Sequence, residues 1–578
     1  MGDNLATLLI AASIAMATWG LGRPAARRLR LDRDGDLAML AWSAGLGALA
    51  VTGLLWLSAC FRCFTAEFLA CGTLLAAIWG LWEYVCAFAR PKAPVVVVLN
   101  DNTVQVPEML PGARRQHTCT WALVGLCACA SLIAALAPPT APAVIARLEP
   151  AKSLVLAHGF SLGAEAFPGV TDVWLAWALA LDGPVGANLV QWLFGLFVAL
   201  ATALLAQLLL GRRHAPLAAA VVLLTPGIQA QMIGPCDGLL CAAFAALAFS
   251  SWWLARTEPP KQRWSVLAGA LAIAAVVSGQ VAMPLLIGAA ASAAYVDWRR
   301  KAGDFVVASS VAGLLVLGVA GLGLCCFGGL PDGWASARPT LLLATVASLG
   351  PLFVAALPAL WICRRLRGLA PLLTICACST LIGLAAFDRA LWVVSLVPAL
   401  AIAVVWVWLE LDRLAESGRL AARLMLGALA VASVCPLITC AVGALAVASG
   451  YESREAYLLR ECQDYELTLL ASHFISEQYH LLTACEPAGY VACRVTTDGS
   501  LSRGLLAPAT GSLSRQQKLR KMGFTHVLMT DPRAPGSTAA PSGHISPEEP
   551  RVQTRGAAIE IALESPRQGQ GYRLLILR

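Results

Sequence analysis

The sequence is dominated by apolar segments of about 20 residues, separated by short loops that carry many of the basic residues. Hydrophobic residues make up 58% of the chain and charged residues only 13%. A soluble protein of 578 residues would need more charged groups on its water-facing surface. A lipid-facing surface does not need them, so the sequence indicates that most of the chain lies in a bilayer.

We expect a polytopic α-helical membrane protein with about 14 transmembrane helices, because lipid offers no partner for a free backbone N–H or C=O group. The segments 215–230 and 263–297 are the least regular, since Pro226 and Pro284 interrupt them. The predicted spans are 4–22, 37–60, 66–88, 118–137, 187–211, 215–230, 237–255, 263–278, 281–297, 304–327, 340–363, 369–387, 390–410 and 424–449.

Basic residues alternate from one loop to the next. Clusters occur in the loops around 23–33, 90–115, 212–213, 256–263, 299–301, 364–367 and 413–419, whereas intervening loops carry single arginines such as Arg62, Arg338 and Arg389. The positive-inside rule places the clustered loops in the cytoplasm. The sequence therefore predicts a multi-pass protein of a bacterial inner membrane with both termini outside the cytoplasm.

Three divisions of the chain are expected. Residues 1–117 contain extra N-terminal transmembrane helices and a cytoplasmic loop. Residues 118–450 form the transmembrane core, with a long outer loop at 138–186 that ends in a Trp-rich helix on the membrane surface, Asp172 to Leu181. Residues 451–578 form a small extracytoplasmic α/β domain. Its predicted elements are a helix over 455–482, strands over 489–495, 525–529, 557–563 and 572–577, and a basic helix over 514–522.

The sequence lacks several motifs that mark common function classes. It has no Walker motif, so it is not an ATP-driven pump, and it has no Gly-x-Gly-x-x-Gly after a strand and no Gly-x-Ser-x-Gly elbow. The net charge of +8 reflects topology, and its expected partners are anionic membrane lipids, not nucleic acid. The remaining function classes are transport, a channel and chemistry at the membrane surface.

Acidic residues gather in the outer loops, and Asp237, Glu149 and Asp172 are the candidate catalytic residues. Asp237 follows a Gly-Pro-Cys turn at the outer start of a span, where it caps the helix and can also line an active site. The alternative to a catalytic role for Asp172 is that it is an ordinary residue on the polar face of the surface helix.

Lys152, Arg147 and Arg389 are candidates for holding a phosphate group near the outer face. The alternative for each is an ordinary basic side chain that reaches from the membrane interface to water. No zinc-type ligand spacing occurs, so a metal site cannot be named from the sequence.

Several segments occur in a familiar order: Pro138-Pro139-Thr140, Lys152, Phe167-Pro168, then Phe387-Asp-Arg389 and the Gly-Phe-Thr-His-Val stretch at 523–527. Over about 118–530 the chain resembles the GT-C superfamily of polyprenyl-phosphate-sugar glycosyltransferases, in particular bacterial relatives of dolichyl-phosphate-mannose–protein mannosyltransferases. The resemblance implies a GT-C-like core and transfer of a sugar from a polyprenyl-phosphate donor to a glycan, lipid or protein acceptor. It leaves open a divalent metal ion as cofactor.

The first-loop acidic motif of that superfamily is degenerate in this chain. The catalytic carboxylate should lie near 141–143, where the sequence reads Ala-Pro-Ala, and Ala146-Arg147 replaces a Tyr-His pair. Glu149 is a candidate for the displaced carboxylate, although a shift of one helical turn is large for reacting groups. The alternatives to an active transferase are therefore a GT-C-fold scaffold that has lost the chemistry, or a transporter.

Overall fold

The computed structural model describes a large part of the chain. The described residues are 2–31, 35–89, 111–140, 148–160, 169–236, 238–257, 261–278, 347–350, 353, 393–411, 416–462, 465, 475, 480–483, 494–496, 520, 525–530, 552–555, 558–564 and 571–577. The predicted spans at 281–297, 304–327 and 369–387 lie outside this set, and of the predicted span 340–363 only residues 347–350 and 353 belong to it.

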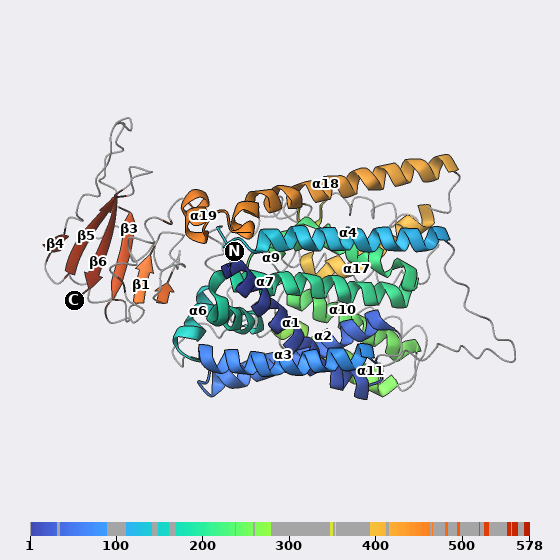
Figure 1. Ribbon diagram of the computed structural model, residues 1–578, viewed down its shortest axis with the longest axis horizontal. Coiled ribbons are helices and arrows are strands. Elements are labelled where there is room, and N and C mark those ends of the chain that lie inside the picture. The colour runs from blue at the N-terminus through green and yellow to red at the C-terminus, as the bar shows by residue number, and fades with distance from the viewer. Residues whose placement is uncertain are drawn as a thin grey trace, which may run out of the picture.

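Long helices form one bundle, and a mixed sheet lies beyond one of its ends (Figure 1). The helices are α1 (Gly2–Arg28), α2 (Asp36–Cys60), α3 (Ala66–Ala89), α4 (Pro111–Ala135), α6 (Glu149–Leu156), α7 (Val170–Leu210), α8 (Ala215–Leu223), α9 (Pro226–Met232), α10 (Gly238–Thr257), α11 (Lys261–Ser278), α17 (Val393–Leu411), α18 (Glu416–Ser449) and α19 (Arg454–Glu461), with a 3-10 turn η1 (Arg212–His214).

Within the described residues, seven helices are long and apolar enough to cross a membrane. The count becomes eight if η1 and α8 form one span with α9, from which they are bent by 71° at the Pro226 break. This confirms a polytopic α-helical membrane protein, since each such helix satisfies its own backbone groups in lipid.

Helix α7 is the centre of the bundle and packs against α2, α8 and α10. It is broken at Asp182 and Gly183, where Gly183 adopts a φ of +68° and Pro184 follows. The segment before the break was expected on the membrane surface. The segment is helical, and it packs against the bundle: Trp174 and Trp177 are buried and donate their indole N–H groups to Thr52 and Thr73 of α2 and α3, each over 2.9 Å.

Helix α1 packs closely against α2 at Gly47. A Cβ atom added to Gly47 would lie 1.7 Å from the carbonyl oxygen of Thr18. The two backbones therefore touch at a position where only glycine fits, as is common between membrane helices.

The C-terminal sheet contains β1 (His480–Thr483), β2 (Arg494–Thr496), β3 (His526–Thr530), β4 (Val552–Arg555), β5 (Ala558–Glu564) and β6 (Gly571–Leu577) in the order β2-β1-β3-β6-β5-β4. Strands β2, β1 and β3 are parallel, and β3, β6, β5 and β4 are antiparallel. The predicted helix over 455–482 is wrong at its end, because residues 480–483 form β1 at an inner position of this sheet.

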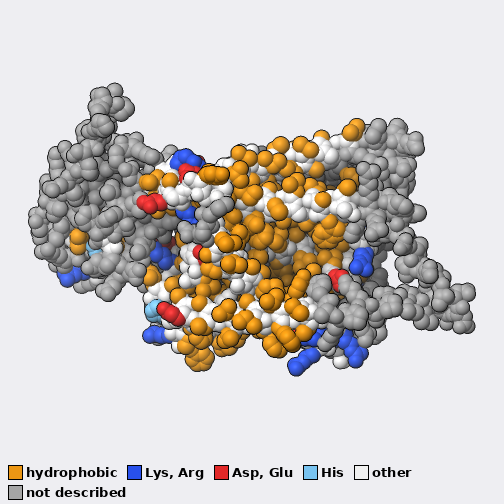
Figure 2. Space-filling view, in the orientation of Figure 1, with side chains coloured by type: hydrophobic (Ala, Val, Ile, Leu, Met, Phe, Trp, Pro, Cys, Tyr) orange, Lys and Arg blue, Asp and Glu red, His pale blue; other side chains and the backbone are white. Residues whose placement is uncertain are grey.

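The two ends of the bundle are named by the residues that they carry. We call the loop end the one that carries α6, the α2–α3 connection and α19, and the basic end the one that carries Arg27, Arg28, Arg212 and Arg213. Figure 2 shows hydrophobic side chains covering the bundle between basic groups at its two extremities. This band is the surface that a bilayer would cover.

Candidate functional site

Two of the candidate residues lie on α6, at the loop end. The Nζ atom of Lys152 is 3.9 Å from Oε1 of Glu149, and both side chains are mostly buried, with 13% and 14% exposed. Their spacing of three residues puts them on one face of the helix. Ala151 and Leu154, also buried, pack this short helix into the bundle core.

The turn after α6 is fixed by backbone hydrogen bonds to the α2–α3 connection. Phe64 N donates to His158 O, and Phe160 N donates to Ala59 O, each over 3.1 Å. Gly159 lies so close to Ala59 that an added Cβ would be 2.3 Å from its carbonyl oxygen. Helix α6 also contacts strand β2 of the C-terminal sheet. Helix α6, which carries Glu149 and Lys152, therefore lies between the bundle and the sheet.

Asp172 is engaged in the start of α7. Its Oδ2 accepts a hydrogen bond of 2.7 Å from the backbone N–H of Gly169, the residue that caps the helix. An acidic group in the first turn also favours the positive end of the helix dipole. This interaction is structural.

Asp237, Arg147 and Arg389 lie outside the described residues, but the neighbours of Asp237 are described. Gln191 of α7 donates its Nε2 to the carbonyl oxygen of Cys236 over 2.8 Å. Asn188, one turn earlier, donates its Nδ2 to the carbonyl oxygen of Ala137 over 2.9 Å. Two adjacent amides therefore hold the start of the outer loop and the turn before α10 next to each other.

Gln231 of α9 approaches the other side of the same turn. A Cβ added to Gly238 would lie 2.6 Å from its Oε1 atom. The oxygens Asn188 Oδ1, Gln191 Oε1 and Gln231 Oε1 are all buried and have no hydrogen-bond partner among the described residues. Amide oxygens can accept hydrogen bonds from sugar hydroxyls or coordinate a hard cation such as Mg²⁺.

We name Asn188, Gln191 and Gln231 the amide cluster. The sequence reasoning missed it, although a signal was present: amide side chains are rare and costly in otherwise apolar spans, and these occur in two such segments. Among the described residues, no group of three His, Cys, Asp or Glu side chains is placed to hold a metal ion.

Comparison with solved structures identifies the fold. The structure of ArnT from Cupriavidus metallidurans bound to undecaprenyl phosphate matches with a TM-score of 0.51 and 15% identity, over 80% of this chain and 98% of that one. The chain has the GT-C fold. At this identity the likeness shows the fold and leaves activity and substrates to be argued from the site.

Two further structures align with lower scores. The apo state of the same ArnT has a TM-score of 0.48 and 15% identity, over 72% of this chain and 93% of that one. The Archaeoglobus fulgidus oligosaccharyltransferase, in complex with Zn and sulfate, has a TM-score of 0.44 and 14% identity, over 71% and 68%. No protein-family model matches the chain, and no curated protein matches its sequence.

Proposed function

We propose that the protein is a membrane glycosyltransferase that moves a sugar from a polyprenyl-phosphate donor to a glycan, lipid or protein acceptor outside the cytoplasm. The observation that carries the proposal is the pair of hydrogen bonds from Asn188 and Gln191 to Ala137 and Cys236. These bonds bring the first outer loop and the turn before Asp237 to one place at the loop end of a GT-C fold.

In this reaction an acceptor oxygen forms a bond to the anomeric carbon of the sugar, while the bond from that carbon to the phosphate oxygen breaks. The released polyprenyl phosphate carries the electron pair of the broken bond. Asp237 takes the acceptor proton or holds a divalent metal ion, and Glu149 and Asp172 are further carboxylates of the site. Lys152, Arg147 and Arg389 stabilise the phosphate charge as it develops.

The orientation in the proposal follows from the basic loops. The end that carries Arg27 and Arg212 faces the cytoplasm of a bacterial cell, and the loop end with the C-terminal sheet faces the periplasm. The contact between α6 and β2 supports a shared compartment for the outer loop and the sheet.

The test is transfer of labelled sugar from polyprenyl-phosphate donors by membranes that contain the protein. We expect Asp237→Asn to lower the transfer rate by about 10²-fold or more, as loss of a general base does. The matched control is Asp36→Asn at the basic end, which should transfer at the wild-type rate. Full activity of Asp237→Asn would remove this carboxylate from the site.

A scaffold that has lost the chemistry is the second candidate. It is favoured by the structural contacts of two acidic candidates, since Asp172 caps α7 and Glu149 lies beside Lys152. The same assay separates the two functions. A wild-type protein that is folded and transfers no sugar from any polyprenyl-phosphate donor supports the scaffold and contradicts the enzyme.

A further inference from the structure

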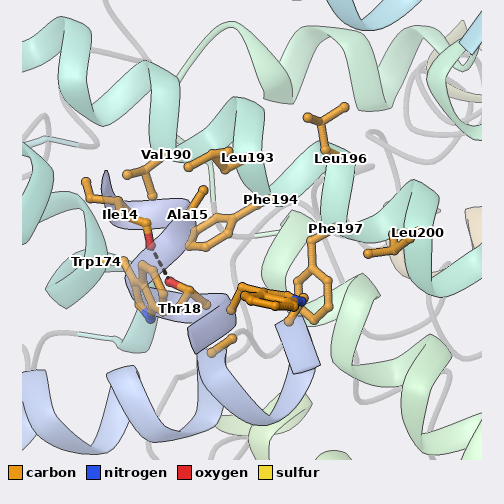
Figure 3. A pocket seen from close by; sticks show the side chains of 13 residues that line it. Ile14, Ala15, Thr18, Trp174, Val190, Leu193, Phe194, Leu196, Phe197 and Leu200 are labelled. Atoms are coloured by element: carbon orange, nitrogen blue, oxygen red, sulfur yellow. Dashed lines mark hydrogen bonds between the residues drawn. The ribbon is translucent and has the colours of Figure 1, made fainter. Parts of the chain in front are cut away.

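A cavity of about 170 Å³ lies between α1, α2 and α7 (Figure 3). Its lining is almost entirely hydrocarbon and includes Ile14, Ala48, Trp174, Phe194 and Leu196. The one hydroxyl in the lining belongs to Thr18, which donates to the carbonyl oxygen of Ile14 over 2.8 Å. The cavity therefore offers almost nothing that water could bind.

The cavity lies near the middle of the membrane-spanning helices. Its lining residues on α1, from Ile14 to Trp19, lie about halfway along the candidate span Asn4–Arg28. At that depth the surrounding solvent is lipid hydrocarbon. For comparison, an apolar protein cavity of about 150 Å³ stays dry and binds benzene. A stretch of about six carbon atoms of a lipid chain matches this space.

The cavity is closed toward the loop end. There Ala11 of α1 packs with Ala135 and Leu136 of α4 and with Leu189 of α7. Farther along, Leu193 and Leu200 on α7 line the cavity and remain partly exposed. A chain that occupies the cavity therefore extends to the side and toward the basic end.

Between the cavity and the basic end, α1 carries polar and charged side chains that suit an anionic head group. Ala15, Trp19 and Arg23 follow one stripe of α1 at four-residue spacing, and the Arg23 guanidinium lies 5.8 Å from the Trp19 ring centroid. Trp19 is 8% exposed, and its indole N–H has no hydrogen-bond partner among the described residues. Arg28 and Arg30 are exposed one to two turns beyond.

We propose that this cavity is a binding site for an anionic phospholipid of the leaflet at the basic end, with one acyl chain between α1, α2 and α7. The acyl chain runs from the cavity past Trp19 and Arg23 toward the basic end, and the phosphate lies at the depth of the exposed Arg28 and Arg30, whose guanidinium groups can donate to its oxygens. The site is separate from the proposed sugar transfer, whose donor phosphate lies at the opposite end of the bundle. The proposal for this lipid site does not depend on whether the protein is an active transferase.

The test is native mass spectrometry of the purified full-length protein with palmitoyl-oleoyl phosphatidylglycerol or phosphatidylcholine. We expect the wild type to bind phosphatidylglycerol about fivefold more tightly, the effect of about one lipid–arginine contact. Ala48→Phe and Ala15→Phe fill the cavity from two helices and should each lower this binding at least about fivefold, because packing drives association in an apolar medium. The double variant Arg28→Gln/Arg30→Gln should bind both lipids equally.

The matched controls are Ala50→Phe on α2 and Ala12→Phe on α1, whose side chains are exposed on the helix surface. Both should bind phosphatidylglycerol as the wild type does, with unchanged thermal unfolding. Wild-type binding in the two cavity-filling variants, while they remain folded, would overturn the site. Displacement of phosphatidylglycerol by an equal concentration of polyprenyl phosphate would overturn the assignment to a phospholipid.

Discussion

Buried amide side chains hold backbone carbonyl groups where helices of this bundle stop or bend. Asn188 and Gln191 bind the carbonyl oxygens of Ala137 and Cys236, and Gln229 donates to Leu223 O over 3.0 Å at the break before α9. Each bond satisfies a carbonyl that the helix no longer pairs, which is essential away from water. The sequence directed attention to carboxylates because they carry familiar chemistry. Which amide meets which carbonyl depends on packing between distant segments.

His526 gives a residue-scale prediction for the C-terminal sheet. It is buried in β3, between β1 and β6, and burial lowers the pKa of its imidazole below the ordinary value of 6.5. The unfolded chain therefore binds a proton first as the pH falls, so the sheet is fully stable above pH 6.5 and loses stability below it. Hydrogen exchange of β3 and β6, corrected for intrinsic rates, should show lower protection at pH 5.5 than at pH 7.5.

The control for this prediction is His526→Phe, which removes the titrating group and keeps a ring in the core. Its protection in β3 should change less between the two pH values than that of the wild type. An equal loss of protection in both proteins would assign the pH dependence to other groups.

The helices themselves follow from apolar length, but their contacts depend on details that a hydropathy pattern does not contain. The expected spans at 37–60 and 66–88 appear as α2 and α3. The Trp-rich segment before Asp182 has the composition of a surface helix, yet Thr52 and Thr73 supply oxygens for its two indole groups inside the bundle. A sequence read locally could not identify those partners, which lie on other helices.

The contact between α1 and α2 gives an element-scale prediction. Gly47→Ala would place a methyl group against Thr18 O and force the helices apart, so we expect a loss of about 1–3 kcal/mol in stability. Gly53 lies on the same helix with nothing within 4 Å of an added Cβ. Gly53→Ala should be neutral or stabilise the protein by up to about 1 kcal/mol. Thermal unfolding in detergent measures both, and equal effects would refute the close contact.

Across the whole molecule, the loop end joins segments that are far apart in the sequence. Arg454, the first residue of α19, donates to Asn4 Oδ1 and Thr7 Oγ1 of α1 over 3.1 and 2.7 Å. Asn4 in turn donates to the carbonyl oxygens of Val447 and Ala448 at the end of α18. These bonds tie the first helix to the segment that leads into the sheet (Figure 1).

This junction predicts that Arg454→Met loosens the C-terminal segment. Hydrogen bonds to a charged group contribute about 1.5–3 kcal/mol, so local opening should increase about tenfold or more. Hydrogen exchange of α19 and of the first turns of α1 in the full-length protein measures this opening. Arg460→Met is the control, because its partners Glu452 and Glu461 lie on the same exposed segment. Equal exchange in both variants would contradict a specific junction.

For the whole molecule, the sequence predicts the fold class well, but it predicts poorly how the helices and the sheet pack against one another. Apolar segments predict a polytopic membrane protein, and a few ordered motifs indicate the GT-C fold that the structural comparison shows. The neighbours of each helix and the junction at Arg454 depend on three-dimensional packing. Of the candidate site, the sequence names charged residues by type and position, but it does not contain the geometry that relates them.

Helix α7 carries two unrelated surfaces on the same two turns. Asn188 and Gln191 face the outer segments, while Val190, Leu193 and Phe194 line the apolar cavity. A rigid helix cannot shift one set of side chains without shifting the other. A lipid chain that shifts α7 at the cavity would therefore also change the distance between Ala137 and Cys236.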